Sequence, residues 1–200
     1  TYMYTYGMFE DCTQLENIDG LSTWNTSSAV DMRSMFRKCS KLKNVNALSL
    51  WNVSRVKYFG DSYNSDNQLG IFSDCESLSD ISGLSNWNTS SVTIMTNMFY
   101  NCRSLSDITP LSGWDVSSVS KMDRMFYNCV SLNNVDGLSK WNTDALSLID
   151  DMFYNSGITN VDGLSNWNIS CIKHLWSVFE YSKNLTDING LSGWDFSNVT

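Results

Sequence analysis

The tryptophans of this chain recur at a nearly fixed interval, and this interval restricts the fold more than any other feature. The marker Leu-Ser-x-Trp-Asn/Asp occurs seven times, mostly 27 residues apart, at Trp24, Trp51, Trp87, Trp114, Trp141, Trp167 and Trp194. A Met-Phe marker, in which Ile or Val sometimes replaces Met, keeps the same spacing at Phe9, Phe36, Phe72, Phe99, Phe126, Phe153 and Phe179. Fixed repeats of roughly 20–50 residues are typical of solenoids, in which each turn covers the apolar face of the next. We therefore predict one elongated repeat domain over residues 1–200.

Within one repeat, the apolar residues are spaced mostly by three. Between Trp87 and Gly113 they are Val92, Met95, Met98, Phe99, Cys102, Leu105, Ile108 and Leu111. This spacing is neither the alternation of a long strand nor the period of a sustained helix. It predicts about seven coils of short parallel strands, turns and 3₁₀ or irregular segments, with the recurring apolar positions stacked in one continuous core.

The residue after each marker tryptophan is always Asn or Asp, and Ser follows two positions later in six of the seven copies. Such side chains accept hydrogen bonds from the backbone a few residues on, so we predict a repeated turn. A repeated contact to a metal or a sugar is the alternative interpretation.

The regular spacing is interrupted once by a long polar stretch. Trp51 and Phe72 lie 21 residues apart where the other copies have 12, which places an insertion near residues 59–68. The chain also begins inside a repeat and stops just after a Trp-Asp-Phe-Ser marker. Because solenoids need polar caps, we expect the sequence to be a piece of a longer protein.

Composition excludes several classes of function. With 13 basic and 21 acidic residues, the net charge of −8 argues against nucleic acid and against an anionic membrane surface as partners. The sequence has no apolar run of about 18 residues, so we predict no direct membrane insertion by this segment. It contains one histidine, His174, and lacks a Cys-x-x-Cys pair, a nucleophile elbow and a phosphate loop. We therefore predict no metal site, no cofactor and no enzymatic activity.

The line Phe99-x-x-Cys102-x-x-Leu105-x-x-Ile108 resembles the core line of BspA-like leucine-rich repeats, a family of surface proteins. The phrase Leu-Ser-x-Trp-Asn-Thr-Ser-x-Val-x-x-Met-x-x-Met-Phe is similar to its bacterial surface-protein subgroup, which has repeats of this length rich in Trp and Met-Phe. The resemblance covers the whole chain. It implies a leucine-rich-repeat-like solenoid in a secreted or surface-anchored protein, often an adhesin. One departure is that Leu111 follows Ile108 by three residues where the common pattern has two, so we expect a shorter or more bent strand.

Five of the six cysteines occupy one repeat position, at Cys12, Cys39, Cys75, Cys102 and Cys129, which Ser156 and Ser182 take in later copies. Adjacent coils lie close enough for disulfides, but side chains in register point the same way. We therefore predict buried, reduced thiols that pack as small apolar groups, with a disulfide ladder as the alternative. Cys171 lies outside this position and is expected to be unpaired.

Two regions are candidates for ligand binding. The position between the repeat's Leu and Ile is always Asn or Asp, at Asn17, Asn44, Asp80, Asp107, Asn134, Asn160 and Asp187. If these residues belong to the parallel sheet, they form a polar ribbon that binds glycans or cations, with Asp80, Asp107, Asn134 and Asn160 as the candidates. A solvated sheet edge is the alternative. The insertion supplies the second candidate site, with Tyr58, Tyr63 and Asp66, although long surface insertions are also tolerated without function.

Six Asn-x-Ser/Thr sequons occur, at Asn25, Asn52, Asn88, Asn168, Asn184 and Asn198. They are possible glycosylation sites only if the source is a eukaryote that secretes the protein.

From these observations we predict a non-enzymatic binding or adhesion module that recognises protein or glycan on a cell or particle surface, in an extracellular location. A structural spacer, or a coat or particle component built from the same solenoid, is the alternative. The residue before the polar ribbon varies among the copies, for example Glu16, Lys43 and Asn133, which favours binding.

Overall fold

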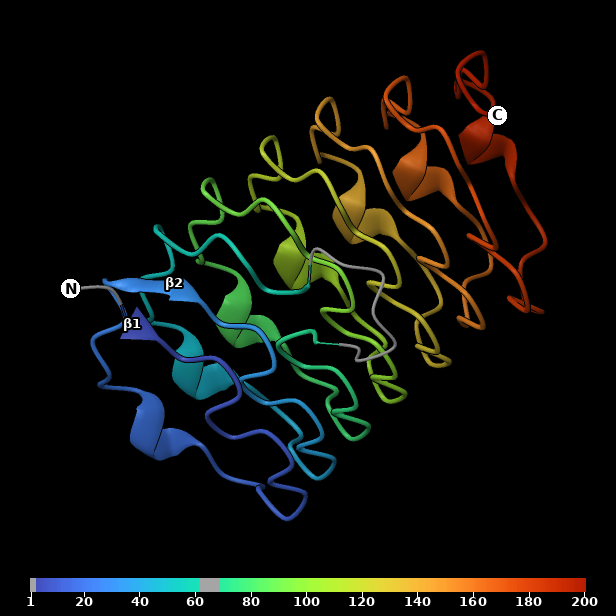
Figure 1. Cartoon of the computed structure of the whole chain (residues 1–200). Helices are drawn as coiled ribbons and strands as arrows, with labels where there is room; N and C mark the ends of the chain where they lie inside the picture. Colours follow the sequence, from blue (N-terminus) through green and yellow to red (C-terminus); the bar gives the residue numbers. More distant parts are fainter. Residues whose placement is uncertain (1–2, 62–68) are drawn as a thin grey trace.

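The chain winds into a solenoid whose two ends lie at opposite ends of the stack of coils (Figure 1). The computed structural model describes residues 3–61 and 69–200. In that part, a short 3₁₀ turn precedes each Leu-Ser-x-Trp marker and ends at the marker's leucine. These turns are η1 (Asp19–Leu21), η2 (Asn46–Leu48), η3 (Ser82–Leu84), η4 (Thr109–Leu111), η5 (Asp136–Leu138), η6 (Asp162–Leu164) and η7 (Asn189–Leu191). They form a row along the axis, which confirms the predicted solenoid of turns and 3₁₀ segments.

The parallel pairing runs along a different line from the one that the sequence suggested. Strands β1 (Met3–Tyr4) and β2 (Ala29–Asp31) pair in parallel. The pairing then continues as single parallel bridges through the position before the first core residue of the Met-x-x-Met segment, at Asp31, Tyr58, Ile94, Lys121 and Leu148. On the expected Leu-x-x-Ile line, the described residues contain one bridge, between Asn44 and Asp80. Within the described residues, the polar ribbon therefore meets the condition of lying on the parallel sheet at Asn44 and Asp80 alone.

The physical reason lies in the ribbon residues themselves. Each of them accepts a hydrogen bond from the backbone N–H two residues later, as Asp107 Oδ1 does from Thr109 at 2.8 Å. This bond bends the chain into the following 3₁₀ turn and uses an N–H that a strand would offer to its neighbour. The line is therefore too short and too bent to form a continuous strand, as the shifted position of Leu111 indicated.

Aromatic stacks form the centre of the core. Successive marker phenylalanines stack with ring centroids 5.5–5.8 Å apart, from Phe9 to Phe179. The tryptophan pairs Trp24–Trp51, Trp87–Trp114 and Trp141–Trp167 stack at 6.2–6.4 Å. Together with the Met, Cys, Leu and Ile positions they form one hydrophobic cluster, so the predicted continuous core is confirmed.

Two sets of hydrogen bonds fix the register of neighbouring coils. The indole N–H of each marker tryptophan from Trp51 to Trp194 donates to the marker-leucine carbonyl of the preceding coil at 2.9–3.2 Å. The backbone N–H of each phenylalanine from Phe9 to Phe153 donates to a carbonyl of the following coil at 2.9–3.1 Å. Because buried polar groups are costly without a partner, a slip by one residue would leave many of them unpaired at once.

Two glycines, Gly60 and Gly70, border the inserted stretch. Phe59 is fully buried and its ring lies 5.4 Å from that of Trp87, so it belongs to the core and not to the loop that we expected to begin there. A Cβ atom on Gly60 would lie 1.7 Å from the Thr96 carbonyl oxygen, and one on Gly70 would lie 1.8 Å from that of Asn97. Both ends of the insertion are therefore pressed against the next coil in a way that only glycine permits.

Candidate functional site: a tyrosine face

Three consecutive coils carry a tyrosine directly after the core phenylalanine, and these tyrosines form a row on the surface. The ring centroids of Tyr100 and Tyr127 lie 4.7 Å apart, and those of Tyr127 and Tyr154 lie 4.5 Å apart with an angle of 2° between the rings. Tyr181 ends the row 5.0 Å from Tyr154, with its ring tilted by 65°. All four rings are at least partly exposed. We call this row, with the polar side chains beside it, the tyrosine face.

The backbone explains why these side chains point outward. Phe99 is buried, Tyr100 is half-buried, and Asn101 adopts a left-handed conformation with φ 60°. The same reversal occurs at Asn128 and Asn155, two residues after their phenylalanines. Asn tolerates this conformation better than most residues. Each coil therefore turns its phenylalanine inward, displays the next side chain, and then changes direction.

The asparagines at these reversals form a second row beside the tyrosines. Asn155 Nδ2 donates to Asn128 Oδ1, and Asn128 Nδ2 donates to Asn101 Oδ1, both at 2.6 Å. Asn101 Nδ2 donates to Asp74 Oδ1 at 2.9 Å. A chain of side-chain amides thus runs along the solenoid axis and ends on a carboxylate. Such connected networks hold their members in one orientation.

Paired charges border the tyrosine row. Arg124 Nε lies 2.9 Å from Asp151 Oδ2. Partial burial raises the pKa of Tyr100 and Tyr127 above the ordinary value of 10.0. The Asp151 charge also raises the pKa of both tyrosines, and the Arg124 charge lowers it. For Tyr154, desolvation in the stack and then its Tyr127 and Tyr181 neighbours raise the pKa to about 12. The phenols are therefore neutral hydrogen-bond donors and acceptors over the physiological range.

The polar ribbon is a row of turns more than an open site. Asp80, Asp107, Asn134 and Asn160 each accept a bond from the backbone N–H two residues on, at 2.8–3.2 Å. Asp80 also accepts from Asn46 Nδ2 at 2.8 Å. Bonds to Ser82 and then to Asn46 lower the pKa of Asp80. One oxygen of each ribbon side chain therefore already accepts a backbone hydrogen bond. The structure does not bring these residues to the tyrosine face.

The second predicted site is described only in part. Tyr63 and Asp66 lie outside the described residues. Tyr58 is half-exposed, and the guanidinium of Arg33 lies 5.6 Å from its ring centroid and 5.3 Å from that of Tyr6. Arg33 also forms an ion pair with Asp31 at 2.7 Å. Tyr58 therefore belongs to a local cluster around Arg33 that connects the first coils.

The Asn/Asp position after each tryptophan forms the predicted turn. All seven side-chain oxygens accept from the backbone N–H two residues on, at 2.9–3.2 Å. In the Asp115 copy, the Ser117 hydroxyl donates to the same oxygen at 2.6 Å and lowers the pKa of the carboxylate. Asn and Asp exchange freely here because the shared oxygen is the acceptor. The sequon asparagines Asn25, Asn52, Asn88, Asn168, Asn184 and Asn198 are all exposed.

The cysteine column consists of free thiols. The Sγ–H groups of Cys39, Cys75, Cys102 and Cys129 each donate to the core phenylalanine carbonyl of the preceding coil at 3.0–3.2 Å. Ser182 does the same with its hydroxyl, donating to Phe153 O at 2.7 Å, which explains why Ser replaces Cys. Burial raises the pKa of Cys39 to about 12. The expectation of a buried thiol is wrong for Cys12, which is exposed.

A buried carboxylate lies in the coil of Tyr127. Asp123 is 6% exposed, and its Oδ2 accepts from Thr96 Oγ1 at 3.2 Å. Its Oδ1 and the neighbouring Asn97 Oδ1 are buried without a hydrogen-bond partner among the described residues. Desolvation raises the pKa of Asp123 to about 6, against the opposing bond from Thr96. Sequence reasoning did not find this group, because the equivalent residues of other copies are Arg33, Thr96 and Asp150.

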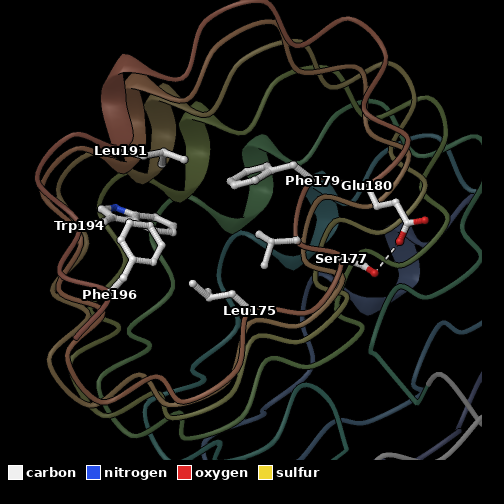
Figure 2. A pocket seen from close by; sticks show the side chains of 8 residues that line it. Leu175, Ser177, Phe179, Glu180, Leu191, Trp194 and Phe196 are labelled. Carbon is white, nitrogen blue, oxygen red and sulfur yellow. Dashed lines mark hydrogen bonds between the residues drawn. The ribbon is translucent and has the colours of Figure 1, made fainter. Parts of the chain in front are cut away.

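One hollow of about 340 Å³ lies at the C-terminal end of the solenoid. Figure 2 shows Leu175, Phe179, Trp194 and Phe196 around it. These side chains occupy core positions of the last two coils of this sequence. In residues 3–61 and 69–200, no group of three or more His, Cys, Asp or Glu side chains is arranged to hold a metal ion. Within the same ranges, no helix is long and apolar enough to cross a bilayer.

Sequence reasoning missed the tyrosine face, although a signal was present. Met-Phe-Tyr-Asn recurs unchanged at residues 98–101, 125–128 and 152–155. These residues lie outside both the predicted strand and the insertion, the two regions from which the sequence predicted binding.

Comparison with known proteins gives a family match over most of the chain. A family model described as "Mycoplasma protein of unknown function, DUF285" matches residues 3–71 and 66–194. No curated protein matches the chain. Among solved structures, a leucine rich cell surface protein from Faecalibacterium prausnitzii A2-165 is 18% identical with a TM-score of 0.29, over 90% of this chain and 67% of that one. An internalin from Listeria monocytogenes is 14% identical with a TM-score of 0.19, over 92% of this chain and 76% of that one. Because these similarities are low, the fold of this chain rests on its own contacts.

Proposed function

Since the chain belongs to the DUF285 family, whose description states no function, we propose from its geometry that it is a non-enzymatic binding module. In this proposal it acts at a cell or particle surface, in an extracellular location, and contacts a protein or glycan partner through the tyrosine face. The resemblance of its repeats to those of BspA-like surface proteins, and to their bacterial subgroup in particular, supports this location.

One observation carries the proposal, namely that the tyrosines are not required by the coil. The equivalent positions of the other copies hold Glu10, Arg37, Ser73 and Glu180, while the core columns stay the same. The fold therefore accepts acidic, basic and small side chains at this position and does not require tyrosine, yet three consecutive coils present tyrosine beside an ordered amide row. Tyrosine combines a large rigid contact area with a polar tip, and it is enriched at recognition surfaces for that reason.

A structural spacer remains the second proposal, because the continuous aromatic core of the solenoid gives reach without any ligand. The two functions differ in what surface variants do. A spacer tolerates any exposed substitution that preserves folding, whereas a binding module loses its partner.

The test measures binding of fluorescently labelled protein to cultured epithelial cells by flow cytometry. The variant Tyr100→Ser with Tyr127→Ser and Tyr154→Ser copies the natural Ser73 copy, so it is expected to fold. We expect it to lose cell binding while its thermal unfolding stays cooperative. The surface control, Ser106→Ala with Ser131→Ala at two exposed positions, is expected to bind as the wild type does.

A further arm addresses the insertion. Residues 60–70 are replaced by Arg-Ser, the connection in the coil of Phe36, which retains the buried Phe59. If this variant loses binding and the tyrosine variant does not, the contact lies at the insertion. Equal binding by the wild type and all three variants would refute the binding function and favour the spacer.

A further inference from the structure

We infer that the partner of the tyrosine face is a neutral linear polysaccharide, held along the solenoid axis. This inference rests on the proposed binding function and adds the chemical class of the ligand. Three features of the face support it: the covered ring faces, the paired charges and the axial repeat.

The tyrosine rings present their edges and hydroxyl groups to a partner. Within the row, each ring face lies against the next, at 4.7 Å and 12° for Tyr100–Tyr127 and at 4.5 Å and 2° for Tyr127–Tyr154. The apolar faces that fill pockets at protein–protein hot spots are therefore already used inside the row. A partner meets phenol oxygens and carboxamides, which can both donate and accept hydrogen bonds.

Charged side chains of the face have hydrogen-bond partners within it, and Arg124 and Asp151 form an ion pair. Arg124 is paired with Asp151, Asp74 accepts from Asn101, and Arg103 Nε donates to Asn101 Oδ1 at 2.8 Å. An anionic ligand would have to compete with Asp151 for Arg124, and a cationic one would have to compete with Asn101 for Asp74. A neutral ligand that offers hydroxyl groups leaves these pairs intact. The raised pKa values keep the phenols neutral as well.

The groups of the face repeat along one line at the coil spacing. Phenols recur every 4.5–4.7 Å, and each amide is bonded to its equivalent one coil away. A linear polysaccharide likewise repeats its hydroxyl groups once per sugar along an extended chain. Several weak contacts made at once then add to a useful affinity.

Tyr181 completes the surface at one end. Its ring is tilted by 65° to that of Tyr154 and is 53% exposed, so one of its faces is not covered by the stack. The apolar C–H side of a sugar ring can pack on such a face while its hydroxyls reach the neighbouring polar groups.

The experiment measures retardation of the protein in native gels containing soluble β-glucan, mannan or xylan, with heparin as the anionic comparison. We expect retardation by a neutral polysaccharide and none by heparin. The triple variant Tyr100→Phe, Tyr127→Phe and Tyr154→Phe keeps the stack and removes three hydroxyls. It is expected to bind about fivefold more weakly for each hydroxyl removed. Ser106→Ala with Ser131→Ala, two exposed positions away from the face, again serves as the control and should leave the retardation unchanged.

A cell-binding arm separates this inference from the proposed function. Periodate oxidation of the cells, which cleaves the vicinal diols of sugars, should abolish binding that depends on the tyrosine face. If face-dependent binding survives periodate, the ligand is a protein and the inference is wrong, while the proposed function stands. Unchanged binding by the Phe variant, or retardation by heparin alone, would also overturn the inference. Cell binding that is insensitive to the Tyr→Ser variant contradicts the proposed function itself.

Discussion

Replacing Asp123 by Asn should stabilise this protein at neutral pH and leave its stability nearly unchanged in acid. Burial raises the pKa of this carboxyl from the ordinary 3.8 to about 6 in the folded chain. The folded state therefore holds the proton more tightly than the unfolded state. The contribution of protonated Asp123 to the unfolding free energy is fully present below the unfolded pKa, and it is lost as the pH rises through about 6.

The size of the effect follows from the difference between the two pKa values. Each unit of difference in pKa is worth about 1.4 kcal/mol, so the wild type loses roughly 2–3 kcal/mol of unfolding free energy above pH 6. In the Asp123→Asn variant, the new side chain would have no charge to desolvate and could still accept the bond from Thr96 Oγ1.

The assay is urea unfolding of both proteins, followed by tryptophan fluorescence between about pH 4 and pH 8, the window over which the carboxyl titrates. The difference in unfolding free energy should rise from near zero to about 2–3 kcal/mol in favour of the variant. Asp107→Asn, at a position where other copies carry Asn, provides the exposed control. A constant difference across this range, or a less stable variant at pH 8, would refute the reasoning.

Three further predictions concern the core and the insertion. Phe126→Ala removes a ring stacked between Phe99 and Phe153 and should cost about 3–5 kcal/mol in chemical unfolding, whereas a loss below about 1 kcal/mol would contradict its burial. Cys102→Val removes the Sγ–H donor to the Phe72 carbonyl, which keeps its bond from the Cys75 N–H, and should destabilise by about 0.5–1.5 kcal/mol, more than Cys102→Ser, which keeps the side-chain bond. The reverse order in thermal melts would show that the thiol bond contributes nothing. Gly70→Ala places a Cβ against the Asn97 carbonyl and should lower the unfolding free energy by more than about 3 kcal/mol. Gly20→Ala, whose Cβ meets no atom within 4 Å, should change it by less than about 0.5 kcal/mol. Similar melting temperatures for the two variants would argue against the close approach at Gly70.

The sequence predicted the core well because the core is what repeats. The positions of Trp, Phe, Cys and Leu face the same environment in every coil, so each copy reports the same constraint. The Asn/Asp turns after the tryptophans were predictable for the same reason, since a local bond of two residues needs no knowledge of distant contacts.

The location of the parallel pairing and of the candidate site was not predictable in this way. Pairing between coils depends on which N–H groups the side chains already use, and the apolar pattern does not reveal that. The tyrosine face and the buried Asp123 depend on neighbours one coil away, as in the Thr96–Asp123 bond. Three identical Met-Phe-Tyr-Asn phrases indicate a shared surface only when the coils are known to stack in register.

The bonds between coils also determine how this molecule would respond to being pulled. The phenylalanine and indole N–H bonds join each coil to its neighbour, and the termini lie at opposite ends of the stack (Figure 1). Tension applied between the termini would therefore pass through these bonds one coil after another. Each coil contacts little beyond its neighbours, so such an array yields from an end by unwinding successive turns. Every turn released would add the contour length of one repeat, and the protein would behave as an extensible tether that lengthens in steps.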